Sequence, residues 1–170
     1  MATVTGGTLV PLFTPFSERG DLLLSSVPAV VKHATGAGAD GIWILAPSGE
    51  GANLTLAEKR AIVKAAAGAK GTAFLLVTVS GMAQVECLEF SRYAEENEAD
   101  GLSVLPPPGL KLSDDELFGF YQAVAETVCI PLTVYQNVGL TGVNFTPALL
   151  ARLATGLPNF IGAQDSSGNL

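Results

Sequence analysis

Residues 46–55 form a glycine-rich loop, Ala-Pro-Ser-Gly-Glu-Gly-Ala-Asn-Leu-Thr, directly after a short apolar run. A small hydroxyl followed by glycine leaves the Ser48 side chain and nearby backbone N–H groups open to an anion, as in a backbone nest or at a helix N-terminus. The same residues could also form an ordinary turn before a helix. Both interpretations remain open from the loop alone.

Tyr135 ends a second apolar run, Leu-Thr-Val-Tyr, and is followed by Gln-Asn. A phenol at the end of a strand can pass protons to and from a bound substrate. A tyrosine in this position could equally be a core side chain that only packs. Function and packing are therefore both possible for Tyr135 on the local sequence.

A third apolar run, residues 160–163, delivers Gln164 into the turn Asp-Ser-Ser-Gly. A lysine at a strand end can attack a ketone once its pKa is lowered, whereas an amide has neither a nucleophilic nitrogen nor a titrating proton. No lysine of the chain is expected at a strand end. The five lysines lie in helical patterns or a loop: Lys32, Lys59, Lys64, Lys70 and Lys111.

Short apolar runs alternate along the chain with helical patterns. The runs are continuous rather than alternating, which is typical of parallel strands covered by helices. The expected strands are residues 8–13, 41–45, 73–79, 101–105, 132–135 and 160–163. The expected helices are residues 24–35, 56–67, 82–97, 113–127 and 147–155.

Helix starts and an internal repeat support this reading. Thr55 with Glu58, and Ser113 with Glu116, have the spacing of a capping box. Residues 38–45 and 98–105 share an Ala-Asp-Gly that leads into a strand, at an offset of two β-α units of about thirty residues each. In each copy we expect the Asp to bond its own turn and the following Gly to take a positive φ.

Two architectures share this alternation, an open doubly wound sheet and a (β/α)8 barrel. The first strand ends in Phe-Thr-Pro-Phe at residues 13–16, without the glycine-rich loop of a dinucleotide site. The barrel is therefore favoured, although a full one takes about 250 residues. We expect an α/β fold of the TIM-barrel type, incomplete, with about six β-α units forming one domain over residues 1–170.

Composition narrows the function. A net charge of −7 argues against a nucleic-acid partner. The chain is 48% hydrophobic with a mean hydropathy of +0.40, yet no apolar run approaches the ~20 residues of a membrane helix. The start has no basic segment of a secretory signal, so a cytoplasmic location is expected.

The chain contains one histidine, His33, and two cysteines, Cys87 and Cys129, and no His/Cys cluster. A metal site is therefore not expected, nor is a cofactor. Both cysteines lie in apolar settings and are expected to be buried free thiols. A disulfide between them remains possible.

The strand-end motifs resemble those of the N-acetylneuraminate lyase / dihydrodipicolinate synthase family of Schiff-base aldolases. Residues 46–50 resemble the family's Gly-Thr-Thr-Gly-Glu loop, and residues 131–142 resemble its Pro-(apolar)3-Tyr-Asn-x-Pro-x-x-Thr-Gly segment. Residues 161–168 resemble its sixth strand, and the Pro-rich loop after residue 105 stands where the family often has Pro-Tyr-Tyr. The resemblance covers the whole chain.

In the family that the chain resembles, complete barrels act on a pyruvate-like 2-oxo acid through a lysine imine and assemble as homo-oligomers; this chain resembles the part up to the sixth strand, and a homo-oligomer is expected for a complete barrel. It assigns the substrate carboxylate to Pro47, Ser48 and Gly49, and proton transfer to Tyr135. Gln164 stands at the position of the Schiff-base lysine.

Four departures from the family pattern matter. Gln136 replaces an Asn, Val138 replaces a Pro, Leu140 stands where the synthases place an arginine, and the loop after residue 105 has no tyrosine. Two hypotheses follow. The first is a lyase for 2-oxo acids in which Gln164 is a mutation. The second is a non-catalytic member that binds a 2-oxo acid or a partner, or a decayed gene fragment; for this polypeptide the missing lysine favours the second.

Overall fold

The computed structural model describes residues 6–80, 83–166 and 168, and these divide into two compact units. Unit 1 consists of Met1–Thr78 with Tyr93–Gly101, and unit 2 of Val79–Arg92 with Leu102–Leu170. Each unit is described by itself below. The expectation of a single domain over residues 1–170 stays a prediction.

The sheet has six strands, and their order follows the sequence, β1-β2-β3-β4-β5-β6. The pairs β1–β2, β2–β3, β4–β5 and β5–β6 are parallel, so the expected sequential arrangement of parallel strands is confirmed. The strands are β1 Leu9–Pro11, β2 Gly41–Ile44, β3 Phe74–Val79, β4 Gly101–Val104, β5 Leu132–Gln136 and β6 Phe160–Asp165.

Helices occupy the connections, as the alternation predicts. The α-helices are α1 Val27–Gly36, α2 Leu56–Ala67, α3 Gln84–Glu96, α4 Asp114–Ala125, α5 Val138–Thr141 and α6 Pro147–Gly156. The 3-10 helices are η1 Leu24–Ser26, η2 Pro47–Gly49 and η3 Gly51–Asn53. The first expected helix is thus split into η1 and α1, with a proline in the first turn of α1. The short α5 was not expected, and the expected start of α3 at Met82 lies outside the described residues.

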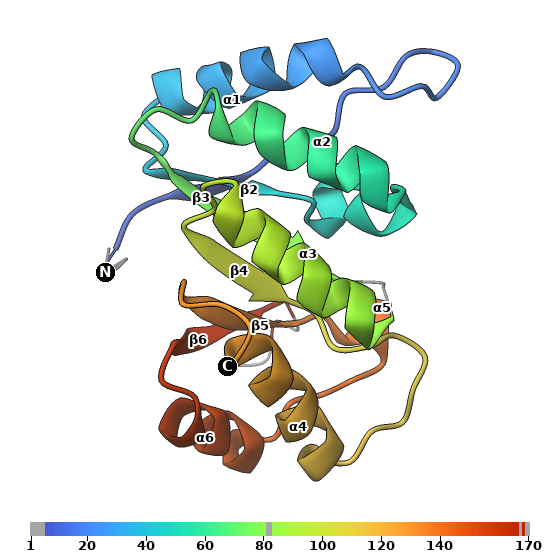
Figure 1. Cartoon of the computed structure of the whole chain (residues 1–170), viewed down its shortest axis with the longest axis vertical. Helices are drawn as coiled ribbons and strands as arrows, with labels where there is room; N and C mark the ends of the chain where they lie inside the picture. Colours follow the sequence, from blue (N-terminus) through green and yellow to red (C-terminus); the bar gives the residue numbers. More distant parts are fainter. Residues whose placement is uncertain (1–5, 81–82, 167, 169–170) are drawn as a thin grey trace. The chain divides into compact units, whose positions relative to one another are not determined.

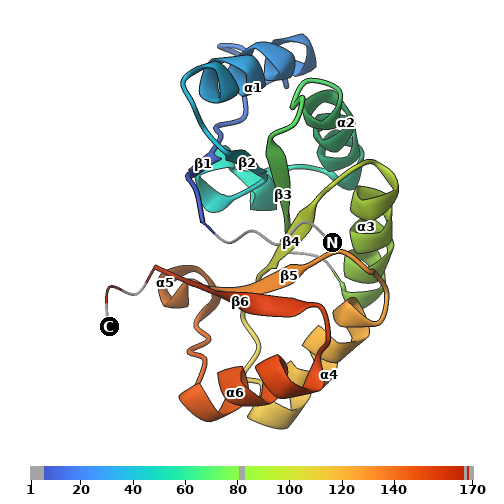
Figure 2. The ribbon, with the colours of Figure 1, turned by 90° about the vertical axis from the view of Figure 1, so that its left-hand side faces the viewer.

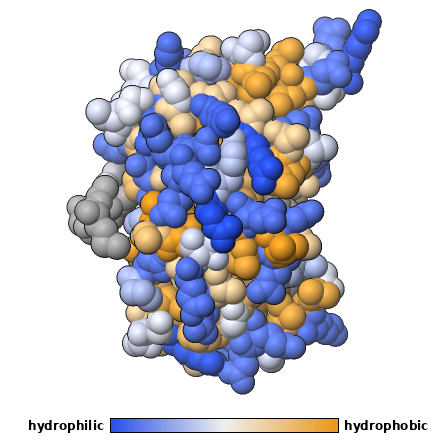
Figure 3. Space-filling model, in the orientation of Figure 1, coloured by the Kyte–Doolittle hydropathy of each residue, from blue (hydrophilic) through white to orange (hydrophobic). Residues whose placement is uncertain are grey.

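In unit 1, helices α1 and α2 lie side by side against strands β1 to β3 (Figure 1). The core between them is made of fully buried aliphatic side chains, among them Val31, Ile42, Val63 and Leu75. Some large apolar side chains are exposed nonetheless, such as Leu23, just before η1, and Leu24, its first residue. Figure 3 shows apolar side chains among polar ones over this helical face, which agrees with the high mean hydropathy.

Both predicted capping boxes are present. The Thr55 and Ser113 hydroxyls accept from the N–H groups of Glu58 and Glu116, and each carboxylate accepts from the N-cap backbone. Hydrogen bonds from the Thr55 side chain and backbone lower the pKa of Glu58, and those from the Ser113 backbone and side chain lower the pKa of Glu116. A lowered carboxyl pKa adds stability above the ordinary glutamate pKa, and this is lost as the pH falls through the lowered value.

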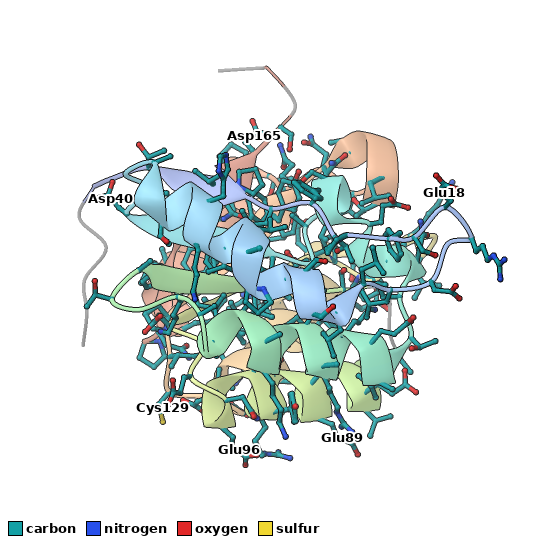
Figure 4. All side chains as sticks on the ribbon, turned by 90° about the horizontal axis from the view of Figure 1, so that it is seen from above. Glu18, Asp40, Glu89, Glu96, Cys129 and Asp165 are labelled. Carbon is teal, nitrogen blue, oxygen red and sulfur yellow. The ribbon has the colours of Figure 1, made fainter. Side chains whose placement is uncertain are left out.

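The repeated Ala-Asp-Gly turns behave differently from our expectation. The Asp40 carboxylate accepts from the Thr8 N–H at 2.7 Å, and Asp100 accepts from the Leu75 N–H at 2.8 Å and pairs with Lys70. Each aspartate therefore ties its turn to a neighbouring strand rather than to its own backbone. Figure 4 shows Asp40 at the amino end of the strands of unit 1, opposite the loop of Glu18 that follows β1.

The glycine expectation in these turns is also wrong. The positive φ occurs three residues before the glycine, at Gly38 (94°) and at Glu98 (64°). Gly41 is needed for a different reason. A Cβ there would lie 2.8 Å from the carbonyl oxygen of Phe74 and closer still to Leu9 Cδ2.

In unit 2, β6 runs alongside β5, and α4 and α6 pack next to each other on one side of this pair (Figure 2). The core includes Tyr121, fully buried, whose hydroxyl donates to the Val104 carbonyl at 3.0 Å. Burial raises the pKa of the nearby Cys87 thiol to about 12, so this thiol stays protonated and unreactive. Cys129 is exposed, which corrects the expectation that both cysteines are buried; neither forms a disulfide.

The side chains of β6 alternate between half-buried and exposed, unlike the continuous burial expected of it. Ile161 is 55% exposed. Within the described part of the chain β5 is the strand that pairs with β6, so one edge of β6 has no strand beside it. At its start, Asn159 is buried and its amide nitrogen donates to the carbonyls of Ala125, Val128 and Ile130.

Gly41→Ala is expected to destabilise the protein by about 2 kcal/mol, because the added methyl overlaps the Phe74 backbone and Leu9 in a packed strand. The matched control is Gly119→Ala in α4, where a Cβ meets nothing within 4 Å. Removing a helical glycine there should add about 0.5–1 kcal/mol. Thermal or urea unfolding measures both, and equal effects for the two variants would contradict the close-contact argument.

Asn159→Ala should lower the free energy of unfolding by about 3 kcal/mol, because it removes the donor shared by three carbonyls between the end of α4 and the start of β5. Asn144→Ala is the control, since Asn144 is exposed, and a change within about 0.5 kcal/mol is expected there. A loss below 1 kcal/mol for Asn159→Ala would show that water replaces the amide.

Candidate functional site

The Ser48 loop begins where β2 ends and consists of two short 3-10 turns. Ser48 and Pro47 are exposed, whereas Gly49 is buried. The Thr14 hydroxyl, just after β1, donates to the Gly49 carbonyl at 2.6 Å. The carboxyl end of β1 therefore holds the loop that follows β2.

Two glycines let this loop approach other backbone closely. A Cβ on Gly49 would lie 2.7 Å from the Leu12 carbonyl oxygen, and one on Gly51 would overlap the backbone of Leu45. Leu45 and Glu50 themselves take left-handed conformations, with φ of 59° and 54°. Such φ values are uncommon outside glycine and persist where the surroundings enforce them. The loop thus has a single, tightly constrained backbone path.

Most N–H groups of the loop are used inside it. Those of Gly49 and Gly51 donate to the Ala46 carbonyl, and that of Glu50 donates to the Pro47 carbonyl. Among the described residues, neither the backbone N–H nor the hydroxyl of Ser48 has a hydrogen-bond partner. Ser48 can therefore offer both a backbone N–H and a hydroxyl to an anion.

Tyr135 and Gln164 lie together in unit 2, because Tyr135 pairs with Gln164 in the parallel register of β5 and β6. Tyr135 is only 8% exposed, yet its hydroxyl oxygen lies in a polar cluster. It accepts from Ser166 Oγ at 2.9 Å and from Asn137 Nδ2 at 3.3 Å. This phenol is therefore hydrogen-bonded at the strand end as well as packed.

Gln164 is half-buried and lies within β6 rather than just after it. Its Oε1 accepts from Ser103 Oγ in β4 at 2.6 Å, and Ser103 is fully buried. Gln164 presents a neutral amide at this position. Its hydrogen-bond partner among the described residues is a hydroxyl, and β4, β5 and β6 place no charged side chain on the same face.

The departures noted in the sequence serve local structure. Gln136 donates to Asp165 at 3.1 Å and accepts from the Phe145 N–H at 2.7 Å, on the face opposite to Tyr135 and Gln164. Asn137 caps α5 by accepting from the Leu140 N–H at 3.1 Å. Leu140 is 47% exposed and places no charge near the strand ends.

The structure thus brings the predicted residues together in two groups. Pro47, Ser48 and Gly49 form one turn of unit 1, while Tyr135 and Gln164 are register partners in unit 2. Sequence reasoning missed three residues that hold these groups: Thr14, Ser103 and Asn137. Ser103 could have been found, because it is the one polar side chain in the apolar run at residues 101–105.

The described residues contain no group of three or more His, Cys, Asp or Glu side chains placed to hold a metal ion. In the same part of the chain no helix combines the length and apolar character needed to cross a membrane. All five lysines lie outside the strands; Lys59 is buried in α2, and Lys70 pairs with Asp100.

Comparison with known proteins places this arrangement. The sequence matches the dihydrodipicolinate synthetase family over residues 4–170. Escherichia coli YagE, named as a candidate 2-dehydro-3-deoxy-D-gluconate aldolase, is 32% identical over 94% of this chain and 53% of its own length. The 4-hydroxy-tetrahydrodipicolinate synthase of Persephonella marina is 31% identical over 96% of this chain and 56% of its own.

Solved structures agree. The crystal structure of YagE in complex with pyruvate has a TM-score of 0.91 at 31% identity, covering 96% of this chain and 55% of YagE. Dihydrodipicolinate synthase from Aquifex aeolicus has a TM-score of 0.90 at 27% identity, covering 96% of this chain and 56% of its own. The chain spans about half the length of the relatives it matches.

The expected fold class is therefore confirmed: an α/β fold of the TIM-barrel type, incomplete, with six parallel strands in sequential order. A family match over nearly the whole sequence and close structural agreement at about 30% identity lead to the same conclusion. This chain belongs to the dihydrodipicolinate synthetase family.

Proposed function

We propose that this chain binds a pyruvate-like 2-oxo acid without forming an imine with it. The proposal rests on Gln164, which the family resemblance aligns with the Schiff-base lysine and whose amide oxygen accepts a hydrogen bond from Ser103. An imine needs an amine nucleophile, which a carboxamide cannot supply. Retained ligand binding without the covalent step is the function that these residues support best.

The carboxylate of the ligand is assigned to Ser48, with Pro47 and Gly49 shaping the turn. Ser48 is exposed, and both of its donors are unused within the described residues, so a carboxylate can accept from its N–H and its hydroxyl. Hydrogen bonds of backbone and hydroxyl donors to an ionised acceptor are stronger than neutral ones. The pyruvate complex of YagE, a relative at 31% identity, supports a ligand of this class.

The family resemblance assigns Tyr135, the register partner of Gln164 within unit 2, to the ketone end of the ligand. In a lyase, a phenol there would move protons during formation of the imine. Without an imine, its contribution is a fixed polar contact, held by Ser166 and Asn137. The family resemblance also suggests a cytoplasmic location and, for a complete barrel, a homo-oligomer.

Sodium borohydride with pyruvate is expected to leave no covalent adduct on this protein, because none of the described lysines lies in a strand. Intact-mass spectrometry followed by peptide mapping measures this. Gln164→Lys is the matched positive control and should gain a reduced pyruvyl adduct at position 164. A pyruvyl adduct on any lysine of the unchanged chain would contradict the proposal and favour the lyase.

Ser48→Ala should weaken pyruvate binding about 3–10-fold, since it removes one of two donors to the carboxylate. The binding constant can be followed by ligand-observed NMR, and the unchanged chain is expected to bind in the millimolar range, ~4 kcal/mol. Ser25→Ala in η1 is the control, because Ser25 is also exposed. Equal affinities for the two variants would remove Ser48 from the site.

A further inference from the structure

We propose that Ser103 orients the Gln164 amide so that its Nε2 donates a hydrogen bond to the keto oxygen of the bound 2-oxo acid. Gln164 then acts as a neutral binding residue, and Ser103 is its positioning residue. This inference rests on the proposed function and adds the group that recognises the ketone. It also explains a buried polar contact that a packed strand would otherwise not need.

Ser103 is a buried hydroxyl in the middle of β4. Its neighbours in β4, Leu102 and Val104, are fully buried, and Ser103 itself has no exposed surface. A hydroxyl in such a place costs free energy unless it is hydrogen-bonded. Its bond to Gln164 Oε1, at 2.6 Å, is short for a neutral pair and joins β4 to β6. The contact therefore fixes the position of the amide oxygen.

The contact with Ser103 also determines the direction of the amide nitrogen of Gln164. A carboxamide is planar, so an oxygen held by Ser103 directs Nε2 and its two N–H groups away from β4. Among the residues that the structure describes, Nε2 has no hydrogen-bond partner. Gln164 is half-buried and lies opposite Tyr135 in the strand register. An oriented donor with no protein acceptor, next to a hydrogen-bonded phenol, suits a ligand oxygen.

The charge of the neighbourhood defines which ligand oxygen fits. Strands β4, β5 and β6 contain no lysine or arginine, and their single charged residue, Asp165, points to the face opposite Gln164. A neutral donor without a nearby cation suits a ketone oxygen better than a second carboxylate, which would lack charge compensation. The site should therefore distinguish a 2-oxo acid from an acid without the keto group.

Restricting the amide also favours binding energetically. A free glutamine side chain has several rotamers and loses conformational entropy when it is fixed. The Ser103 contact fixes it before the ligand arrives, so less of this cost falls on binding. Removing the hydroxyl should weaken recognition of the ketone without touching the ligand directly.

The test uses the full chain labelled with ¹⁵N and pyruvate as the probe. The side-chain amide signals of Gln164 are assigned by their loss in Gln164→Glu. Addition of pyruvate should shift these signals. Pyruvate should also bind more tightly than propionate, which has the carboxylate but no keto oxygen. Gln164 signals that stay unmoved at the highest soluble pyruvate concentration would overturn the inference.

The same spectra separate this inference from the proposed function. Shifts at the Ser48 and Gly49 backbone signals without shifts at Gln164 would leave carboxylate binding standing and refute the role of Gln164. Shifts at Gln164 alone would support the amide contact and refute the assignment of the carboxylate to Ser48. No shift at either place refutes both.

Two variants test the positioning role. Ser103→Ala should weaken pyruvate binding ~3–10-fold, the effect of one neutral hydrogen bond, and leave propionate binding unchanged. Ser91→Ala is the control, because Ser91 is equally buried but donates to the Cys87 carbonyl within α3. An unchanged preference for pyruvate over propionate in Ser103→Ala would refute the positioning role.

Gln164→Glu gives an independent reading should Ser103→Ala fail to fold. A glutamate still accepts from Ser103 but has no N–H to donate. Its charge repels the carboxylates of both ligands alike, so the pyruvate-to-propionate ratio, and not the absolute affinity, is the readout. That ratio should fall to about one, and a ratio equal to that of the unchanged chain would overturn the inference.

Discussion

Parallel pairing of β5 with β6 is the constraint on which the candidate site of unit 2 depends. The register contains one irregularity, between Leu132 and Thr133, and from there it runs in step to Gln136 and Asp165. Because side chains alternate between the faces of a sheet, this step puts Tyr135 and Gln164 on one face and Gln136 and Asp165 on the other. A shift by one residue would exchange the two faces and replace the phenol–amide pair by a glutamine–aspartate pair.

The register is itself held from the opposite end of the strands. The Asn159 amide joins three carbonyls around the start of β5 to the start of β6, so the two strands begin at fixed heights. In unit 1, Asp40 before β2 and Asp100 before β4 have a comparable role, because each carboxylate accepts a hydrogen bond from a backbone N–H at or next to a neighbouring strand. Polar side chains at the amino ends of the strands thus help to fix the register of neighbouring strands. The register in turn determines which side chains lie together at the carboxyl ends, where the candidate site residues are.

Much of this could be predicted from the sequence, and the exceptions have physical reasons. Continuous apolar runs predicted the strands, and the spacing between a hydroxyl residue and a glutamate predicted the starts of α2 and α4. Both signals are local in the sequence. The role of Asp40 and Asp100 could not be read in this way, since Thr8 and Leu75 are 32 and 25 residues distant. Ser103 was missed for the same reason: its partner is 61 residues further along, and only the strand order brings β4 and β6 within reach of each other.

In the proposed function, a glutamine stands where the family resemblance places a lysine, and the surroundings of position 164 favour the neutral side chain. A lysine at position 164 would carry a charge into a half-buried place where β4, β5 and β6 supply no carboxylate on the same face, and desolvation would disfavour the charged form. In a catalytic lysine this desolvation penalty is useful, because it lowers the pKa of the amine toward neutrality. A neutral amide avoids the desolvation cost and satisfies Ser103 with a hydrogen bond. Under the proposed function, β6 keeps its packing and its register with β5 although it has no nucleophile, and Tyr135 and Gln164 are the groups proposed to contact the 2-oxo acid.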